Sequence, residues 1–269
     1  HMDGGLAGYA HNAFGDGGER GMAIDGPLGI VDFIELYFKD PAFMTTSVLF
    51  DWYNLGYKQT VLAGSDFPLD PFTAPMLGVT RAHVYLGPGN FSFANILASA
   101  AQGFTYATNG PLVDFTINSA LPGTELTLSG PQTLDIQVRG RINPTLGEQL
   151  TKIELISQGD VIASMTIAPG EEYDATLSFP FQTSQSCWIA AKVTTPRTGA
   201  ITTAVYVTID GASFSRADEL ASRAAYMETK LDEVEALMSD GTIPAAQTTD
   251  LQAYIDQSRA VYQSMQVAP

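Results

Sequence analysis

Two short segments of the chain end in side chains that can bind a divalent metal ion. The apolar run VLAGSDFP, residues 61–68, leads to Asp66, and GLAGYAH, residues 5–11, leads to His11 in the same way. In barrels and open sheets of parallel strands, the carboxyl ends of the strands hold the chemistry. A neutral imidazole and a carboxylate suit zinc, manganese or iron. The pair therefore indicates a metal site, and the alternative interpretation is a structural histidine with a loop-capping aspartate.

Three further residues are candidates for neighbours of such a site. Glu35 lies within the apolar segment FIELYF, where an unpaired carboxylate would be costly, so it needs an ion pair or a place in a site. Arg81 can bind an anionic group of a substrate or pair with an acid of the site. His83 alternates with apolar residues in TRAHVYL, which fits either a strand face or a site.

Other catalytic signatures are missing from the sequence. It contains no GxSxG nucleophile motif, no P-loop, and no GxGxxG following a strand. The single cysteine, Cys187, cannot form an internal disulfide, and we expect it to be a small buried side chain.

Composition limits the partners of the protein. The 269 residues include 13 Lys and Arg against 29 Asp and Glu, so the formal net charge is -16. This balance lacks the basic footprint of a nucleic-acid-binding protein and disfavours an anionic membrane surface. No segment is long and apolar enough to span a bilayer. We therefore expect neither a nucleic acid nor a membrane as a partner.

The pattern of elements divides the chain into three regions. Residues 3–103 alternate predicted strands (within 5–11, 29–38, 59–66 and 81–86) with predicted helices over 44–57 and 91–103, the second ending at Gly103. This alternation is typical of an α/β unit with parallel pairing. Residues 104–212 contain eight short, often alternating runs separated by turn signals, which predicts an antiparallel β-sandwich. Residues 213–269 carry two apolar stripes at helical spacing, which predict a helical hairpin beginning with a capping box at Ser215 and Asp218.

Several segments, in this order, resemble the later part of the CehA/McbA-type metallohydrolases of the PHP (polymerase and histidinol phosphatase-like) superfamily. They are GYAHNAFG, GIVDFIELYF, DWYNLGYKQTVLAGSDFP, GVTRAHVYLG, the long run from FSFANIL to VDFTIN, and SCWIAAKV with AVYVTIDG. The most specific of these blocks is GFTYATNGP, residues 103–111. The resemblance covers most of residues 4–212.

The resemblance implies a fold and an activity. It implies an α/β plus β architecture, in which a partial PHP-like (β/α) barrel precedes an Ig-like antiparallel β-sandwich and the helical hairpin. It implies a divalent metal (zinc, manganese or iron) that assists hydrolysis of an ester, carbamate or phosphoester bond. By position, His11 and Asp66 resemble metal ligands of the family, with Glu35, Arg81 and His83 as neighbours.

The sequence also departs from the family pattern. Asn12 and Pro68 stand where the family has Pro and His, His83 stands where it has Tyr, and no His-x-His motif precedes His11. Either this chain omits the front of the barrel, or the protein has lost the site. We expect the longer natural chain to carry the His-x-His motif and the metal, and this chain alone to be inactive, with or without a metal of its own.

The alternative is a non-catalytic binding protein whose β-sandwich recognises a glycan or a protein partner. Tyr173, Phe181 and Trp188 are candidates for an aromatic platform, although core packing is the simpler role for Trp188. A partial barrel exposes strand edges, so we expect a homo-oligomer or a missing N-terminal segment to cover them. The family resemblance predicts an extracytoplasmic location, secreted or periplasmic, and the substrate is a small molecule of unknown identity.

Overall fold

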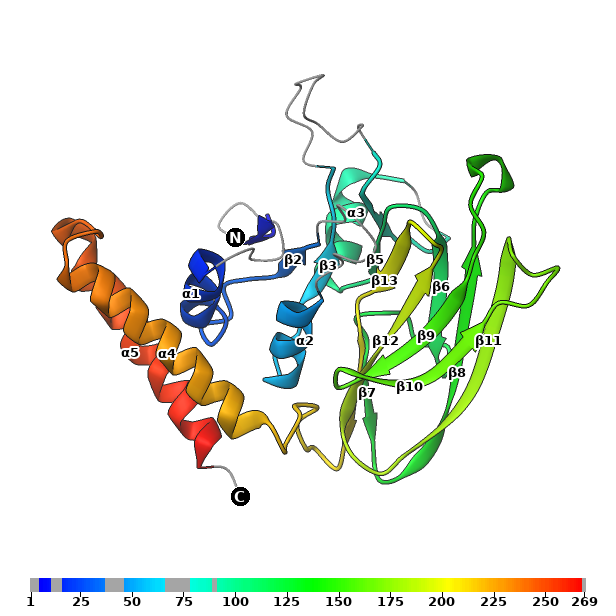
Figure 1. The fold of residues 1–269 in the computed structure, drawn as a ribbon. Coiled ribbons are helices and arrows are strands. Elements are labelled where there is room, and N and C mark those ends of the chain that lie inside the picture. The colour runs from blue at the N-terminus through cyan, green and yellow to red at the C-terminus, as the bar shows by residue number, and fades with distance from the viewer. Residues whose placement is uncertain (1–4, 11–15, 37–45, 66–77, 89–90, 268–269) are drawn as a thin grey trace.

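The computed structural model describes residues 5–10, 16–36, 46–65, 78–88 and 91–267. It shows mixed α and β structure with several sheets and a C-terminal pair of helices (Figure 1). The predicted metal ligands His11 and Asp66 lie outside the described residues.

A small parallel sheet forms the N-terminal part. Its strands are β1 (Gly8–Tyr9), β2 (Phe33–Glu35) and β3 (Thr60–Leu62), in that order. Both pairs are parallel, with Gly8 opposite Phe33 and Phe33 opposite Thr60. The parallel pairing expected from the alternation of strands and helices is therefore confirmed for these three strands. Within the described residues the sheet does not close into a barrel.

Helix α2 (Ser47–Asn54) joins the parallel sheet to the rest of the molecule. Its residues Leu49, Trp52 and Tyr53 are buried. The rings of Phe50 and Tyr53 each lie 5.0 Å from the ring of Trp188. Burying such large rings is worth about 1.5–3 kcal/mol each, so this aromatic cluster holds the two parts together.

Two sheets with a shared core make up the central part. The larger has the order β10-β9-β12-β13-β5-β4, with β14 on β12 and β7 on β14, and the smaller has the order β11-β8-β6. Inward residues such as Ile136 and Val138 alternate with exposed ones along β8 and are fully buried. The bounds are β4 Arg81–Val84, β5 Thr105–Thr108, β6 Leu112–Ile117, β7 Glu125–Leu128, β8 Gln132–Arg141, β9 Lys152–Ser157, β10 Asp160–Thr166, β11 Asp174–Thr183, β12 Cys187–Thr194, β13 Gly199–Thr202 and β14 Val205–Ile209, with a 3-10 turn at Pro144–Leu146.

The larger sheet crosses the predicted boundary at residues 103–104. Strand β4 pairs antiparallel with β5, with His83 opposite Tyr106, and β5 pairs with β13. The sequence predicts neither β5 nor β13, and it predicts parallel pairing for β4, which is wrong. The parallel pairing predicted for β4 fails because its partner in the structure is β5, a strand that the sequence pattern does not reveal. Helix α3 (Phe93–Ala101) precedes β5 and ends as predicted, with Gly103 at a φ of 74°.

The free edge of β3 is closed by threonine side chains of the larger sheet. The Val61 N–H donates to Thr203 Oγ1 at 2.9 Å, and Thr105 Oγ1 donates to the Val61 carbonyl at 2.7 Å. The two hydroxyl oxygens are 2.8 Å apart. A hydroxyl has one proton, and that of Thr105 is used on the carbonyl, so the Thr203 hydroxyl donates to Thr105. The three bonds form a closed ring that begins and ends on Val61.

The C-terminal helices form the predicted hairpin. They are α4 (Leu220–Ser239) and α5 (Ala245–Gln266), and they pack against α1 (Asp16–Asp25), which the sequence does not predict (Figure 1). Ser258 is fully buried, and its hydroxyl donates to the Ile24 carbonyl at 2.7 Å. The predicted capping box at Ser215 is wrong, because α4 begins at Leu220 without a side-chain cap.

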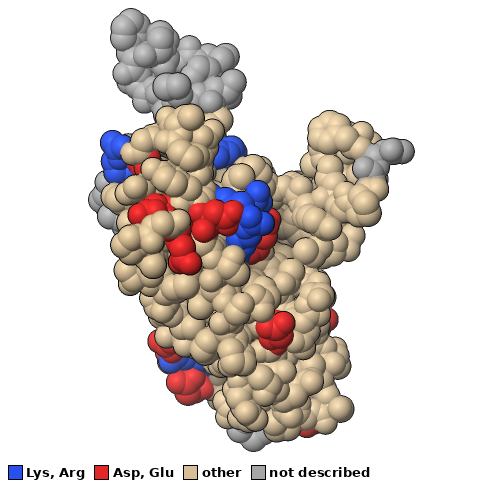
Figure 2. All heavy atoms as spheres, turned by 90° about the vertical axis from the view of Figure 1, so that its right-hand side faces the viewer, with Lys and Arg blue, Asp and Glu red and all other residues tan. Residues whose placement is uncertain are grey.

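The face on the right of Figure 1 is shown in Figure 2, where most of the surface is uncharged and acidic groups lie beside basic ones. Two ion pairs of the smaller sheet fit this pattern, Arg139 with Asp174 and Arg141 with Asp114. Among the described helices, none combines the length and the apolar character that a membrane span requires.

Candidate functional site

The carboxyl ends of β1, β2 and β3 meet at one edge of the parallel sheet, because the strands run parallel and in register. Pairing continues one residue past β2, where the Leu36 N–H donates to the Leu62 carbonyl at 2.8 Å. In sequence, His11 directly follows Ala10 beyond β1, and Asp66 directly follows Ser65 beyond β3. The described strands therefore lead from one edge into both segments that the sequence singled out.

Glu35 is the last residue of β2, and its side chain is partly buried at this edge. A Cβ atom on Gly64 would lie 2.4 Å from Glu35 Oε1, which is closer than atoms that are not bonded approach. The carboxylate thus occupies the place that a side chain at residue 64 would take. Glycine at this position lets the strand pass close to the carboxylate.

The described residues contain no group of three or more His, Cys, Asp or Glu side chains that could hold a metal ion. A metal site at this edge would therefore need ligands from the segments that the structure does not describe, in addition to Glu35.

Arg81 and His83 contact each other on β4. Arg81 Nε donates to His83 Nε2 at 3.3 Å, and its guanidinium also donates to the carbonyls of Gly78, Val79 and Gly110. The His83 ring stacks on Tyr106, with the centroids 4.7 Å apart and the planes 2° from parallel. Burial, followed by the charge of Arg81, lowers the pKa of His83, so the imidazole is neutral at pH 7.

The block GFTYATNGP, the most specific part of the resemblance, is a tightly bonded turn. The buried Thr108 hydroxyl donates to the Pro111 carbonyl at 2.6 Å and accepts from the Gly110 N–H at 2.9 Å. Asn109 Oδ1 accepts from the Gly199 N–H at 2.7 Å. The Thr108 bonds thus fix the turn itself, and the Asn109 bond connects it to β13.

Of the three candidates for an aromatic platform, Trp188 is fully buried, and its Nε1–H donates to Asn54 Oδ1 at 2.7 Å. It is a core residue, as the simpler interpretation of the sequence expects. Tyr173 is 39% exposed and Phe181 packs partly against the core of the two sheets. A platform that includes Trp188 is excluded.

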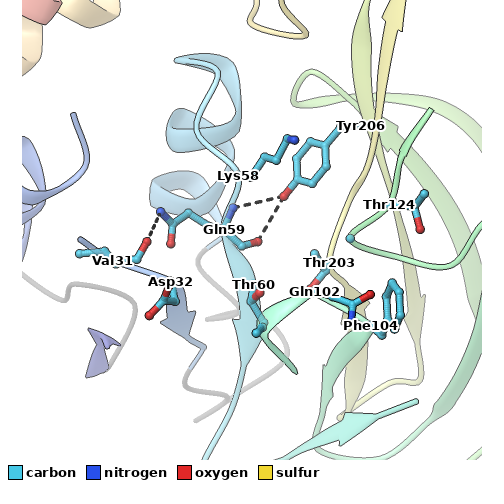
Figure 3. Close-up of a pocket in the computed structure, with 13 residues that line it drawn as sticks. Val31, Asp32, Lys58, Gln59, Thr60, Gln102, Phe104, Thr124, Thr203 and Tyr206 are labelled. Carbon is cyan, nitrogen blue, oxygen red and sulfur yellow. Dashed lines mark hydrogen bonds between the residues drawn. The ribbon is translucent and has the colours of Figure 1, made fainter. Parts of the chain in front are cut away.

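A cavity that the sequence does not predict lies at the opposite edge of the parallel sheet, where β2 and β3 begin (Figure 3). Its volume is about 390 Å³, and its lining comes from the parallel sheet, the end of α3, the turn before β7, and β14. Two glycines are its only signal in the sequence: Gly103, which ends a predicted helix, and Gly123, which follows Pro122 in one of the predicted turns. The sequence gives no sign that these two turns touch.

Comparison with known proteins does not assign this chain to a family. No family model matches the chain, and no curated protein matches it. A superoxide reductase (neelaredoxin) from Ignicoccus hospitalis is 18% identical, with 37% of this chain and 81% of that chain covered and a TM-score of 0.24. An engineered protein is 21% identical, with 36% of this chain and 20% of that chain covered and the same TM-score of 0.24. Likeness at this level supports no statement about fold or activity.

Proposed function

We propose that this chain is the C-terminal portion of a PHP-like, metal-dependent hydrolase that acts on an ester, carbamate or phosphoester bond. In this proposal, β1, β2 and β3 are part of a (β/α) barrel, and the two central sheets are its Ig-like β-sandwich. The parallel order of the three strands supports the proposal, because barrels of this kind place their chemistry where such strands end.

The observation that carries the proposal is the position of Glu35. Its carboxylate lies at the carboxyl edge of the sheet, against the backbone of Gly64, and Gly64 is two residues before Asp66 in sequence. In the proposed site His11 and Asp66 are metal ligands, and Glu35 is a ligand or a hydrogen-bond acceptor beside them. This mixture of nitrogen and oxygen donors suits zinc, manganese or iron. A divalent ion bound there would supply the Lewis acidity that hydrolysis of these bonds requires.

Arg81 and His83 have a supporting role in this proposal. The Arg81 guanidinium bonds three backbone carbonyls as well as His83, and the neutral His83 ring packs on Tyr106. These contacts fix the strand that lies beside β5. We therefore assign both residues to the positioning of β4 rather than to the metal.

The experiment measures metal binding before activity. The chain is loaded with Zn²⁺ or Mn²⁺, desalted, and its metal content is determined by inductively coupled plasma mass spectrometry. We expect one or more ions per chain, lost in His11→Ala and Asp66→Asn. His83→Gln and Asp135→Asn are the matched controls, because His83 packs on Tyr106 and Asp135 is exposed on β8. Metal that is retained equally in all four variants would contradict the proposal, and so would metal that is absent from this chain both alone and together with an upstream segment that carries a His-x-His motif.

Activity is then tested in the metal-loaded chain. The substrates are p-nitrophenyl acetate, bis-p-nitrophenyl phosphate and an aryl carbamate. We expect this chain alone to bind metal but to hydrolyse them poorly. Addition of an upstream segment with a His-x-His motif should raise the rate. An unchanged rate with that segment would contradict the assignment to the family.

A further inference from the structure

The cavity at the amino ends of β2 and β3 is separate from the proposed metal site, which lies at the other edge of the sheet. Its volume of about 390 Å³ falls within the range of about 300–1,000 Å³ that is typical of small-molecule sites. Figure 3 shows Asp32, Gln59 and Thr60 on one side of the cavity and Gln102, Phe104 and Thr124 on the other.

The wall that carries Gln102 and Thr124 is fixed by contact between two backbones. Gly103 and Gly123 have φ angles of 74° and 83°, a region that favours glycine. A Cβ atom on Gly123 would lie 2.0 Å from the Gln102 carbonyl oxygen. The two turns can pack this closely only without side chains, and the packing sets the positions of the neighbouring Gln102 and Thr124.

The opposite wall is held equally firmly. The Gln59 N–H donates to the Tyr206 hydroxyl at 3.2 Å, and the hydroxyls of Tyr53 and Tyr206 donate to the Gln59 carbonyl at 2.9 and 3.4 Å. Burial raises the pKa of Tyr206 well above its ordinary value, so these phenols stay protonated. This wall is therefore in place before a ligand arrives.

Gln59 also has an unused acceptor. Its Nε2 donates to the Val31 carbonyl at 3.2 Å, while its Oε1 has no hydrogen-bond partner among the described residues, although the residue is only 4% exposed. The orientation of the Gln59 amide follows from this bond, because the opposite orientation would place Oε1 against the Val31 carbonyl oxygen, where neither atom can donate. The Oε1 atom is sealed from solvent in this arrangement, so the wall of the cavity contains a polar group that no described donor satisfies.

The charges of the cavity disfavour anions. Lys58 Nζ is bonded to Glu125 Oε2 at 2.5 Å and lies 5.8 Å from the centroid of the Tyr206 ring. This hydrogen bond helps lower the pKa of Glu125, so the lysine is already neutralised by a carboxylate. Asp32 adds a negative charge to the lining. A phosphate or carboxylate would find no free cation among these groups.

The remaining lining groups match hydroxyls. Asp32 Oδ2 accepts from the Ala7 N–H at 2.8 Å, and a carboxylate has further lone pairs for a hydroxyl. Gln102 Nε2 donates to the Ala98 carbonyl at 3.3 Å, and the Gln102 amide and the Thr124 hydroxyl can still both donate and accept. The Phe104 ring offers an apolar surface beside them (Figure 3). We propose that this cavity binds a small neutral polyol of monosaccharide size, with its hydroxyls bonded to Asp32, Gln102 and Thr124 and its C–H face against Phe104.

The test uses the whole chain and three probes, D-glucose, D-galactose and myo-inositol. Saturation-transfer-difference NMR and isothermal titration calorimetry should detect at least one of them with a Kd of about 1 mM. Gln102→Ala and Thr124→Val should each weaken binding by roughly threefold to tenfold, since each removes a hydrogen bond. Gln132→Ala and Thr133→Val, exposed at the start of β8, are the matched controls and should bind as the parent does.

Three results would overturn the proposal. They are the failure of all three polyols to saturate the protein, binding that both cavity variants leave unchanged, and binding of inorganic phosphate or ethanolamine in the cavity in place of a polyol. Circular dichroism of each variant shows whether it is folded, so that weaker binding is not mistaken for unfolding.

Discussion

The ring of hydrogen bonds around Val61 predicts the effect of one isosteric substitution. Val61, Thr105 and Thr203 are each at most 1% exposed. Thr203→Val keeps the size of the side chain but removes the acceptor of the Val61 N–H, which then has no water to replace it. A buried donor left without a partner costs about 1–3 kcal/mol, so we expect the free energy of unfolding to fall by that amount.

A substitution at the second threonine tests whether the three hydrogen bonds of the ring depend on one another. Thr105→Val removes the donor of the Val61 carbonyl and the acceptor of the Thr203 hydroxyl, and should cost about 1 kcal/mol or more. Either substitution alone opens the ring. The double variant should therefore lose about 1 kcal/mol less than the sum of the two single losses.

The assay is urea unfolding monitored by tryptophan fluorescence, because Trp52 and Trp188 are both buried in the folded protein and become exposed when it unfolds. Hydrogen exchange of the Val61 amide reports the same bond directly. Thr133→Val, exposed on β8, is the control and should change stability by less than about 0.5 kcal/mol. The reasoning is refuted if Thr203→Val is as stable as this control and Val61 exchanges no faster.

Three further predictions concern other parts of the molecule. In Gly64→Ala the new methyl group displaces the flexible end of the Glu35 side chain, so the melting temperature should stay nearly unchanged. Metal uptake should fall by roughly tenfold, because the displaced carboxylate no longer supports the site. Uptake equal to that of the parent would show that Glu35 has no role in metal binding. Because the pKa of His83 is lowered by folding, the unfolded chain binds its proton first, and stability is lost as the pH falls below about 6.5. His83→Gln should flatten the stability profile between about pH 7 and 5.5, and an unchanged slope in urea unfolding would contradict this. Ser258→Ala removes the bond from α5 to the Ile24 carbonyl and should cost about 1 kcal/mol, seen as faster limited proteolysis of the hairpin; an unchanged rate would count against it.

The sequence predicts best where periodicity is long. Helices α4 and α5 are 20 and 22 residues long, and the hairpin that their apolar stripes predict is present. Helix α1 is missed because its sequence, DGGERGMAID, contains three glycines and little apolar pattern. It is stabilised by burial of Met22, Ala23 and Ile24 against distant parts of the chain, which no local pattern reveals.

The two candidate sites also differ in how far the sequence alone reveals them. Glu35 is unusual in sequence because a carboxylate interrupts an apolar strand, and the structure places it at the strand end against Gly64. The cavity depends on Gly103 and Gly123, which are 20 residues apart and meet only in the folded chain. Local sequence can identify a turn glycine, but not the second backbone that requires it.

The ring around Val61 also restricts how the parallel sheet can grow. A strand edge usually invites further strands through its unpaired N–H and carbonyl groups. On the side of β3 that faces away from β2, the groups of Val61 are already taken by threonine hydroxyls. A further strand, from another segment or from a second molecule, therefore cannot pair beside Val61, and this edge of the sheet is closed to extension.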